Sequence, residues 1–152
     1  KVDCKIVMNL GNAGNRNPRI EIYDGAQLNV SGQLIKHSTA GNTVHVNVLG
    51  GTITNTGSGF FADGTASFSI EGGVFNFSSS DDVSNLVQLV DIAYYKIIDV
   101  QDSNGKTYKA VVPLNTQCGN HTYTLHSTYE ACCSSCKKDN FVCLGCKNSF
   151  QI

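Results

Sequence analysis

The sequence has little charge and no long apolar run. Only 15% of its 152 residues are charged, the net charge is −1, and the arginines are Arg16 and Arg19 alone. Surfaces that bind nucleic acid need many basic side chains to face phosphates, so nucleic acid is not an expected partner. A membrane span needs about 20 apolar residues in a row, and we expect none here. The first residues, Lys-Val-Asp-Cys, do not resemble a signal peptide, which a secreted chain would already have lost.

The chain also lacks tryptophan and has two prolines, whereas it has 15 glycines. Valine, isoleucine, threonine and phenylalanine are frequent, and these residues favour strands, while glycine favours the turns between strands. With 41% hydrophobic residues, a core of ordinary size can form. The composition therefore predicts an all-β protein.

A spacing of glycines predicts how the strands are arranged. Gly25, Gly51 and Gly73 lie 26 and 22 positions apart, each with an apolar residue three positions before it and another two or three after it. Repeats of this length without helix are typical of one turn of a parallel β-helix. We predict a coil of about four turns within residues 1–115, with an antiparallel β-sandwich as the alternative. Two inward ladders follow from the alignment: Ile22, Val48, Ile70 and Ile92, and beside them Leu28, Ile53, Phe75 and Ile97.

Two segments depart from this repeat. Residues 80–91 begin like a capped helix, but their β-branched residues and their place in the repeat favour a strand. Asn104-Gly105 predicts a hairpin with a type I′ turn, which would cover one end of the coil or add strands along one side. Residues 116–152 are predicted to form a second, cysteine-rich segment.

Cysteines and glycosylation sequons indicate an oxidising compartment. The three sequons begin at Asn29, Asn76 and Asn120. Disulfides are expected among the seven cysteines: Cys4, Cys118, Cys132, Cys133, Cys136, Cys143 and Cys146. Because seven is odd, one cysteine is expected to be free or to pair with another chain. The alternative is a zinc site formed by two C-x-x-C pairs: Cys133, Cys136, Cys143 and Cys146.

No group of residues predicts catalysis. Asp81 and Asp82 are the one adjacent acidic pair, and a helix cap or a loop explains them without a reaction. The expectation is a protein without enzymatic activity and without a cofactor. Several aromatic residues are candidates for stacking on a sugar, although core packing suits most of them better: Phe60, Phe61, Tyr94, Tyr95 and Tyr123.

The alternation over residues 20–100 resembles right-handed parallel β-helix proteins, a group that includes polysaccharide lyases, bacterial adhesins and phage tailspikes. The C-x-x-C run resembles cysteine modules in surface proteins of eukaryotes, protists especially. With the sequons, these patterns predict an extracellular or cell-surface glycoprotein whose partners are N-linked glycans and copies of itself. We expect it to form a filament or coat by end-to-end stacking or strand exchange, with residues 2–8 as the donated strand. The alternatives are a carbohydrate-binding or carbohydrate-active module and a zinc module.

Overall fold

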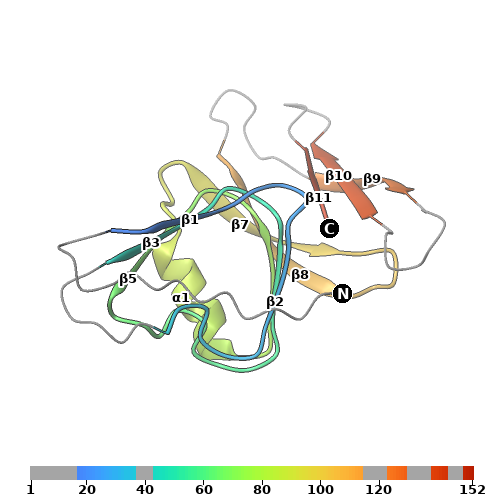
Figure 1. The fold of residues 1–152 in the computed structure, drawn as a ribbon. Helices are drawn as coiled ribbons and strands as arrows, with labels where there is room; N and C mark the ends of the chain where they lie inside the picture. Colours follow the sequence, from blue (N-terminus) through green and yellow to red (C-terminus); the bar gives the residue numbers. More distant parts are fainter. Residues whose placement is uncertain (1–16, 37–42, 115–122, 130–137, 144–148) are drawn as a thin grey trace.

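The computed structural model describes residues 17–36, 43–114, 123–129, 138–143 and 149–152, and most of them belong to strands (Figure 1). The expectation of an all-β protein is therefore confirmed in its broad form. Within the described part of the chain, no helix has the length and apolar character of a membrane span.

Three successive passes of the chain form the first half of the fold. Each pass consists of two strands joined by a glycine corner: β1 (Arg19–Ile22) and β2 (Gln27–Val30), β3 (Val44–Val48) and β4 (Thr52–Asn55), β5 (Ala66–Ile70) and β6 (Val74–Phe77). The corner glycines Gly25, Gly51 and Gly73 have φ values of 84°, 83° and 99°, a region that side chains disfavour. At Gly51 a Cβ atom would also lie 2.9 Å from two backbone oxygens.

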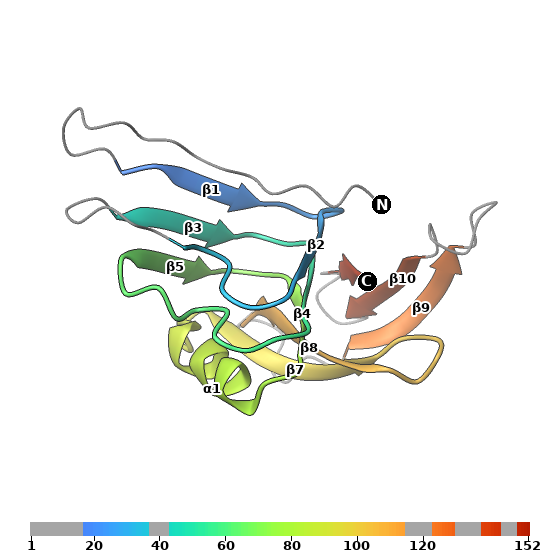
Figure 2. The ribbon, with the colours of Figure 1, turned by 60° about the horizontal axis from the view of Figure 1, so that its bottom comes forward.

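The passes lie on one another and pair in parallel (Figure 2). The sheet of β1, β3 and β5 brings three aliphatic residues into register: Ile22, Val48 and Ile70. The sheet of β2, β4 and β6 does the same for Leu28, Ile53 and Phe75. The two predicted ladders are thus confirmed over three passes, and this parallel pairing contradicts a purely antiparallel sandwich.

The predicted fourth turn is wrong, because residues 80–91 do not form a strand. Helix α1 (Ser80–Leu89) occupies this segment, and the Ser79 side chain caps it by accepting a hydrogen bond from the Asp82 backbone N–H at 3.4 Å. Val90, not Ile92, then forms a parallel bridge with Ile70, and Ile92 is 78% exposed. The helix forms because its cap and its inward Leu86, which is fully buried, outweigh the β-branched residues.

A hairpin follows the helix and extends the second sheet. It consists of β7 (Tyr95–Gln101) and β8 (Thr107–Pro113), and β8 pairs antiparallel with β6, so the strand order is β2-β4-β6-β8-β7. Phe75 therefore pairs with Lys109 instead of Ile97. This sheet is mixed, and the described sheets do not close into a solenoid.

The hairpin is confirmed, but its turn is not the predicted one. The Gly105 N–H donates to the carbonyl oxygen of Asp102 at 2.9 Å, so Ser103 and Asn104 are the central residues and Gly105, with φ 79°, comes after them. The Asp102 side chain selects this turn by accepting a hydrogen bond from the Asn104 backbone N–H at 2.9 Å.

A small antiparallel sheet covers the outer side of the hairpin. It contains β9 (Tyr123–Tyr129), β10 (Lys138–Cys143) and β11 (Ser149–Gln151). Phe141 of β10 is 4% exposed and packs with residues on the outward face of the second sheet: Val74, Val100, Ala110 and Val112. A separate core lies between the two sheets of the passes and α1. The predicted boundary at residue 115 falls outside the described residues.

Candidate functional site

Two rows of polar side chains lie on the outward face of the second sheet. Leu28 and Ile53 point into the core, so the residues on either side of each point outward. The outward residues of β2 and β4 are Gln27, Asn29, Thr52 and Thr54. Gln27 is in register with Thr52 and Asn29 with Thr54, which places the partners about 4.8 Å apart across the strands. These four side chains form the floor of a groove.

One wall of this groove is the tip of the β7–β8 hairpin. Oδ1 of Asp102 accepts hydrogen bonds from the backbone N–H groups of Asn104 and Lys106, each at 2.9 Å. Its Oδ2 accepts a hydrogen bond from the Tyr108 hydroxyl at 3.3 Å. Asp102, Asn104 and Tyr108 line the groove, and the contacts to one carboxylate hold them in a fixed arrangement.

The C-terminal sheet forms the other wall. Asp139 of β10 is 4% exposed, and its Oδ2 accepts a hydrogen bond from the Ser103 backbone N–H at 2.7 Å. The backbones of Asp139 and Ile152 exchange two hydrogen bonds of 3.0 Å. Both residues line the groove, and the bond to Ser103 fixes this wall to the hairpin tip.

The groove is small, polar and acidic. Its volume is about 270 Å³, and no lysine, arginine or histidine is among its described lining residues. The pKa of Tyr108 is raised above its ordinary value by burial, by the charge of Asp102 and its hydrogen bond to that carboxylate, and by the charge of Asp139. Lys106 lies just outside the lining, with Nζ 5.1 Å from the centre of the Tyr108 ring. An uncharged ligand rich in hydroxyl groups fits this lining better than an anion does.

The adjacent acidic residues Asp81 and Asp82 lie in different surroundings. Asp82 is fully buried, and its Oδ1 accepts a hydrogen bond from the Phe60 backbone N–H at 2.8 Å. Its Oδ2 accepts one from the Asn55 side-chain amide at 3.0 Å. Asp81 lies exposed in the first helical turn. Asp82 therefore stabilises the fold, since it joins α1 to the second pass.

Asn55 is the other half of this buried contact, and sequence reasoning missed it. Its side-chain oxygen accepts hydrogen bonds from the backbone N–H groups of Gly32 at 2.8 Å and Gly57 at 3.2 Å. One signal could have found it. Ile53 points inward on an alternating strand, so Asn55, two residues later, points inward as well.

The predicted aromatic candidates lie elsewhere. Phe60 is 1% exposed and packs edge-to-face on Phe61 with ring centroids 4.9 Å apart, so both belong to the core. Tyr123 packs against the apolar cluster around Phe141, and none of the five aromatic candidates lines the groove. Tyr108, which the sequence analysis did not single out, is its aromatic residue.

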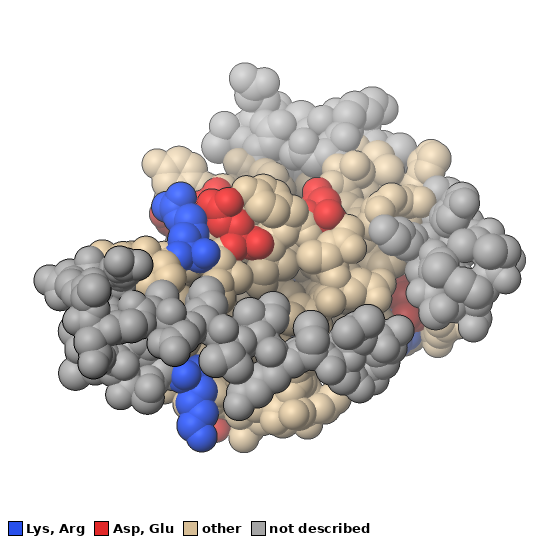
Figure 3. Space-filling view, viewed as in Figure 1, with Lys and Arg blue, Asp and Glu red and all other residues tan. Residues whose placement is uncertain are grey.

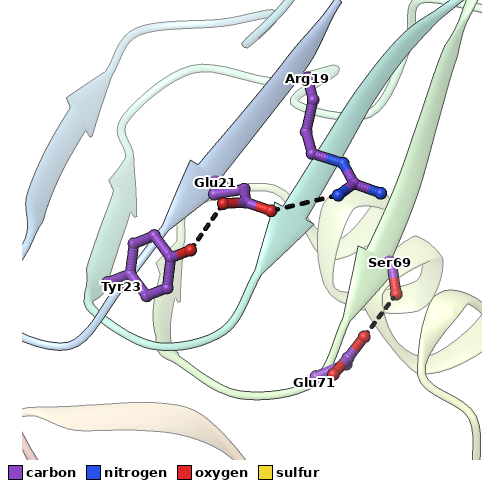
Figure 4. Close-up of polar contacts among 5 residues, drawn as sticks. All are labelled: Arg19, Glu21, Tyr23, Ser69 and Glu71. Carbon is purple, nitrogen blue, oxygen red and sulfur yellow. Dashed lines mark hydrogen bonds and ion pairs between the residues drawn. The ribbon is translucent and has the colours of Figure 1, made fainter.

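The outward face of the first sheet carries local polar contacts (Figure 4). The Tyr23 hydroxyl donates a hydrogen bond to Glu21 at 2.6 Å, and this bond and the charge of Glu21 raise the pKa of Tyr23. Arg19 lies 3.4 Å from Glu21, and Ser69 donates to Glu71 at 3.2 Å. Solvent screens such exposed contacts. In Figure 3, lysine, arginine and acidic side chains on the described surface of that view occur in small groups and form no basic patch.

The predicted glycosylation and cysteine residues are only partly within the described chain. Asn29 is exposed and Asn76 is half-buried, and both point away from the core as expected, while Asn120 lies outside the described residues. Cys143 is 3% exposed. The other six cysteines lie outside the described residues, so the disulfide and zinc alternatives stay predictions.

Comparisons with protein-family models, with curated proteins and with solved structures give no match. What the groove binds therefore has to follow from its own chemistry.

Proposed function

We propose that the protein is an extracellular module that binds a neutral sugar of a glycan in the groove between the passes, the hairpin tip and the C-terminal sheet. The observation that carries this proposal is the lining of the groove. It combines amides, hydroxyls and carboxylates, and none of its described lining residues is a lysine, arginine or histidine. The sequons and the cysteines support an extracellular location.

Sugar hydroxyls both donate and accept hydrogen bonds, and the side chains of the groove offer both. Gln27, Asn29 and Asn104 supply amide donors and acceptors, while Asp102 supplies acceptor oxygens. The carboxylates of Asp102 and Asp139 oppose an acidic sugar, since like charges repel. The volume of about 270 Å³ lies just below the range of about 300–1,000 Å³ for drug-sized ligands. It therefore suits one sugar unit better than a long chain.

The test is calorimetric titration of the unglycosylated chain with neutral oligosaccharides built from glucose, mannose, xylose or N-acetylglucosamine, and with oligogalacturonate as the acidic comparison. We expect binding of at least one neutral sugar and none of oligogalacturonate. Gln27→Ala and Thr54→Val should each weaken binding about two- to tenfold, the equivalent of one hydrogen bond. Asn47→Ala is the matched control, because Asn47 points outward from the first sheet. The proposal is wrong if no neutral sugar binds, or if the control weakens binding as much as the groove variants.

A second candidate function is self-association, which a difference between the two ends of the passes favours. At one end, β1 and β2 have a partner strand on one side only among the described residues. At the other end, a mainly apolar hollow of about 470 Å³ lies beside α1 and β7, and its lining includes the exposed Val87 (53%) and Ile92 (78%) as well as two lysines, Lys96 and Lys109. Two unlike ends make a head-to-tail contact, and repeated contacts of that kind give a filament.

This second proposal treats the passes as turns of a short parallel β-helix, as in the surface proteins that the sequence resembles. Its support is the parallel register of three passes. Sedimentation velocity over a range of concentrations should show association that Ile92→Asp weakens at least tenfold. Leu125→Asp is the control, because Leu125 is 42% exposed on β9. A wild-type protein that stays monomeric at its highest soluble concentration would contradict this proposal.

A further inference from the structure

The glycosylation sequon at Asn29 coincides with the floor of the groove. Asn29 is exposed on β2, opposite Thr54, and its side chain lines the groove together with Asp102 and Tyr108. The sequon continues through Val30 to Ser31. An N-linked glycan is attached at the side-chain amide nitrogen of asparagine, so its first sugar would start inside the groove.

We infer that a glycan on Asn29 occupies the groove with its own first sugars and thereby excludes an external sugar. This inference rests on the proposed function, since it assigns a regulator to the same site. Glycosylated and unglycosylated forms of the chain would then differ in one property: only the unglycosylated groove is open to a partner glycan.

Tethering makes this occupation effective even where the affinity is low. A ligand on a short flexible link has an effective concentration in the millimolar range. The first two sugars of an N-linked glycan are N-acetylglucosamine, which is uncharged and bears hydroxyls and an amide. Such uncharged sugars match the polar, acidic lining, so a site of about millimolar affinity would be substantially filled by the attached glycan.

The second described sequon provides the comparison. Asn76 is half-buried on β6 and does not line the groove. Asn76 is in register with Thr54 of the groove floor, so a glycan at that position starts beside the groove, whereas a glycan on Asn29 starts within it. Loss of the Asn29 sequon should therefore matter, and loss of the Asn76 sequon should not.

The experiment uses the full chain from a secretory eukaryotic host as wild type, Ser31→Ala and Ser78→Ala. Ser31→Ala removes the Asn29 sequon and keeps the Asn29 side chain, and Ser31 does not line the groove. Mass spectrometry reports the occupied sequons. Amide hydrogen exchange then reports the hairpin tip, residues 102–106, and calorimetry reports binding of N,N′-diacetylchitobiose and of the neutral oligosaccharides named above.

We expect the glycosylated wild type to exchange hydrogen at the hairpin tip at least fivefold more slowly than Ser31→Ala, and to bind every sugar at least tenfold more weakly. Ser78→Ala should match the wild type in both. If Asn29 carries no glycan, or carries one without slowing exchange, the inference is wrong. If Ser31→Ala binds no sugar although exchange is slowed in the wild type, the proposed function fails and occupation of the groove stands.

Discussion

The three passes and the segment after them, residues 80–114, cover apolar side chains in different ways. In the passes, equivalent strands of successive passes pair in parallel, so side chains at matching positions form ladders such as Ile22, Val48 and Ile70. In the later segment a helix closes the core with Leu86, and an antiparallel strand occupies the edge of β6. The repeat is confined to the first region. The buried contact at Asp82, which accepts hydrogen bonds from Asn55 and Phe60, joins the two regions.

Removing that contact should have the largest effect. Asp82→Ala leaves the Asn55 amide and the Phe60 N–H buried without an acceptor. Each such donor costs about 1–3 kcal/mol, so we expect the free energy of unfolding to fall by about 2–6 kcal/mol. Urea denaturation followed by circular dichroism measures it. Asp81→Ala is the control and should cost less than about 1 kcal/mol, because Asp81 is exposed. Equal losses of unfolding free energy in the two variants would mean that the contact between α1 and the second pass does not depend on the buried carboxylate.

Truncating one ladder residue tests how far the repetition extends. Ile70 is 2% exposed and Ile92 is 78% exposed, although the sequence aligns them as equivalent. Ile70→Ala should lower the free energy of unfolding by about 2–5 kcal/mol, the cost of a cavity in a packed core. Ile92→Ala should change it by less than about 0.5 kcal/mol. If the same denaturation experiment shows a similar loss of unfolding free energy in both variants, Ile92 is part of the core after all.

This pair also shows what the sequence could predict. Alternation and glycine spacing predicted the inward ladders correctly for three passes. Every pass needs a glycine at its corner and apolar residues at its inward positions, so the pattern recurs in the sequence. They failed at Ser79, where one cap and the next turn of residues favoured a helix over the β-branched residues of the segment. The repeat pattern itself does not indicate which pass is the last, because the end of the stack is covered through packing with other parts of the chain.

The groove was harder to predict than the ladders. Asn29 and Thr54 could be assigned to an outward face by alternation, and Asn55 could have been assigned inward by the same rule. Asp102 and Asp139 are 37 positions apart in sequence, and they meet through a hydrogen bond from Ser103 to Asp139. No local pattern marks such a contact, because it joins two segments that are far apart in the sequence.

Two glycines with similar backbone angles distinguish a corner of the passes from the hairpin. Gly51 has φ 83° and Gly105 has φ 79°. A Cβ atom at Gly51 would lie 2.9 Å from two backbone oxygens, whereas at Gly105 nothing lies within 4 Å. Gly105→Ala should cost about 1–2 kcal/mol from its backbone angle alone. Gly51→Ala should cost more, because stacked backbone cannot move aside. Thermal unfolding of both variants measures the difference, and equal costs would show that the corner relaxes as easily as the hairpin tip.

The smallest effect concerns alkaline pH and belongs to the hairpin side. Burial first, and then the charge of Asp102, its hydrogen bond and the charge of Asp139, raise the pKa of Tyr108 above 10.0. Above pH 10 the unfolded chain therefore loses the phenol proton while the folded chain retains it. The unfolded state then binds fewer protons, so stability decreases as the pH rises from 10 through the higher pKa of the folded state.

Tyr108→Phe removes this contribution and should make the loss of stability above pH 10 less steep than in the wild type. Denaturation midpoints at a series of pH values measure the slope, and phenolate absorbance of the folded protein gives the titration directly. Burial also raises the pKa of Tyr95, together with the charge of Glu71, so Tyr95→Phe on the β7 edge is the matched comparison. If Tyr108→Phe leaves the slope of stability against pH unchanged while Tyr95→Phe reduces it, the carboxylates of the groove do not raise the pKa of Tyr108. The groove would then be less acidic than its lining indicates.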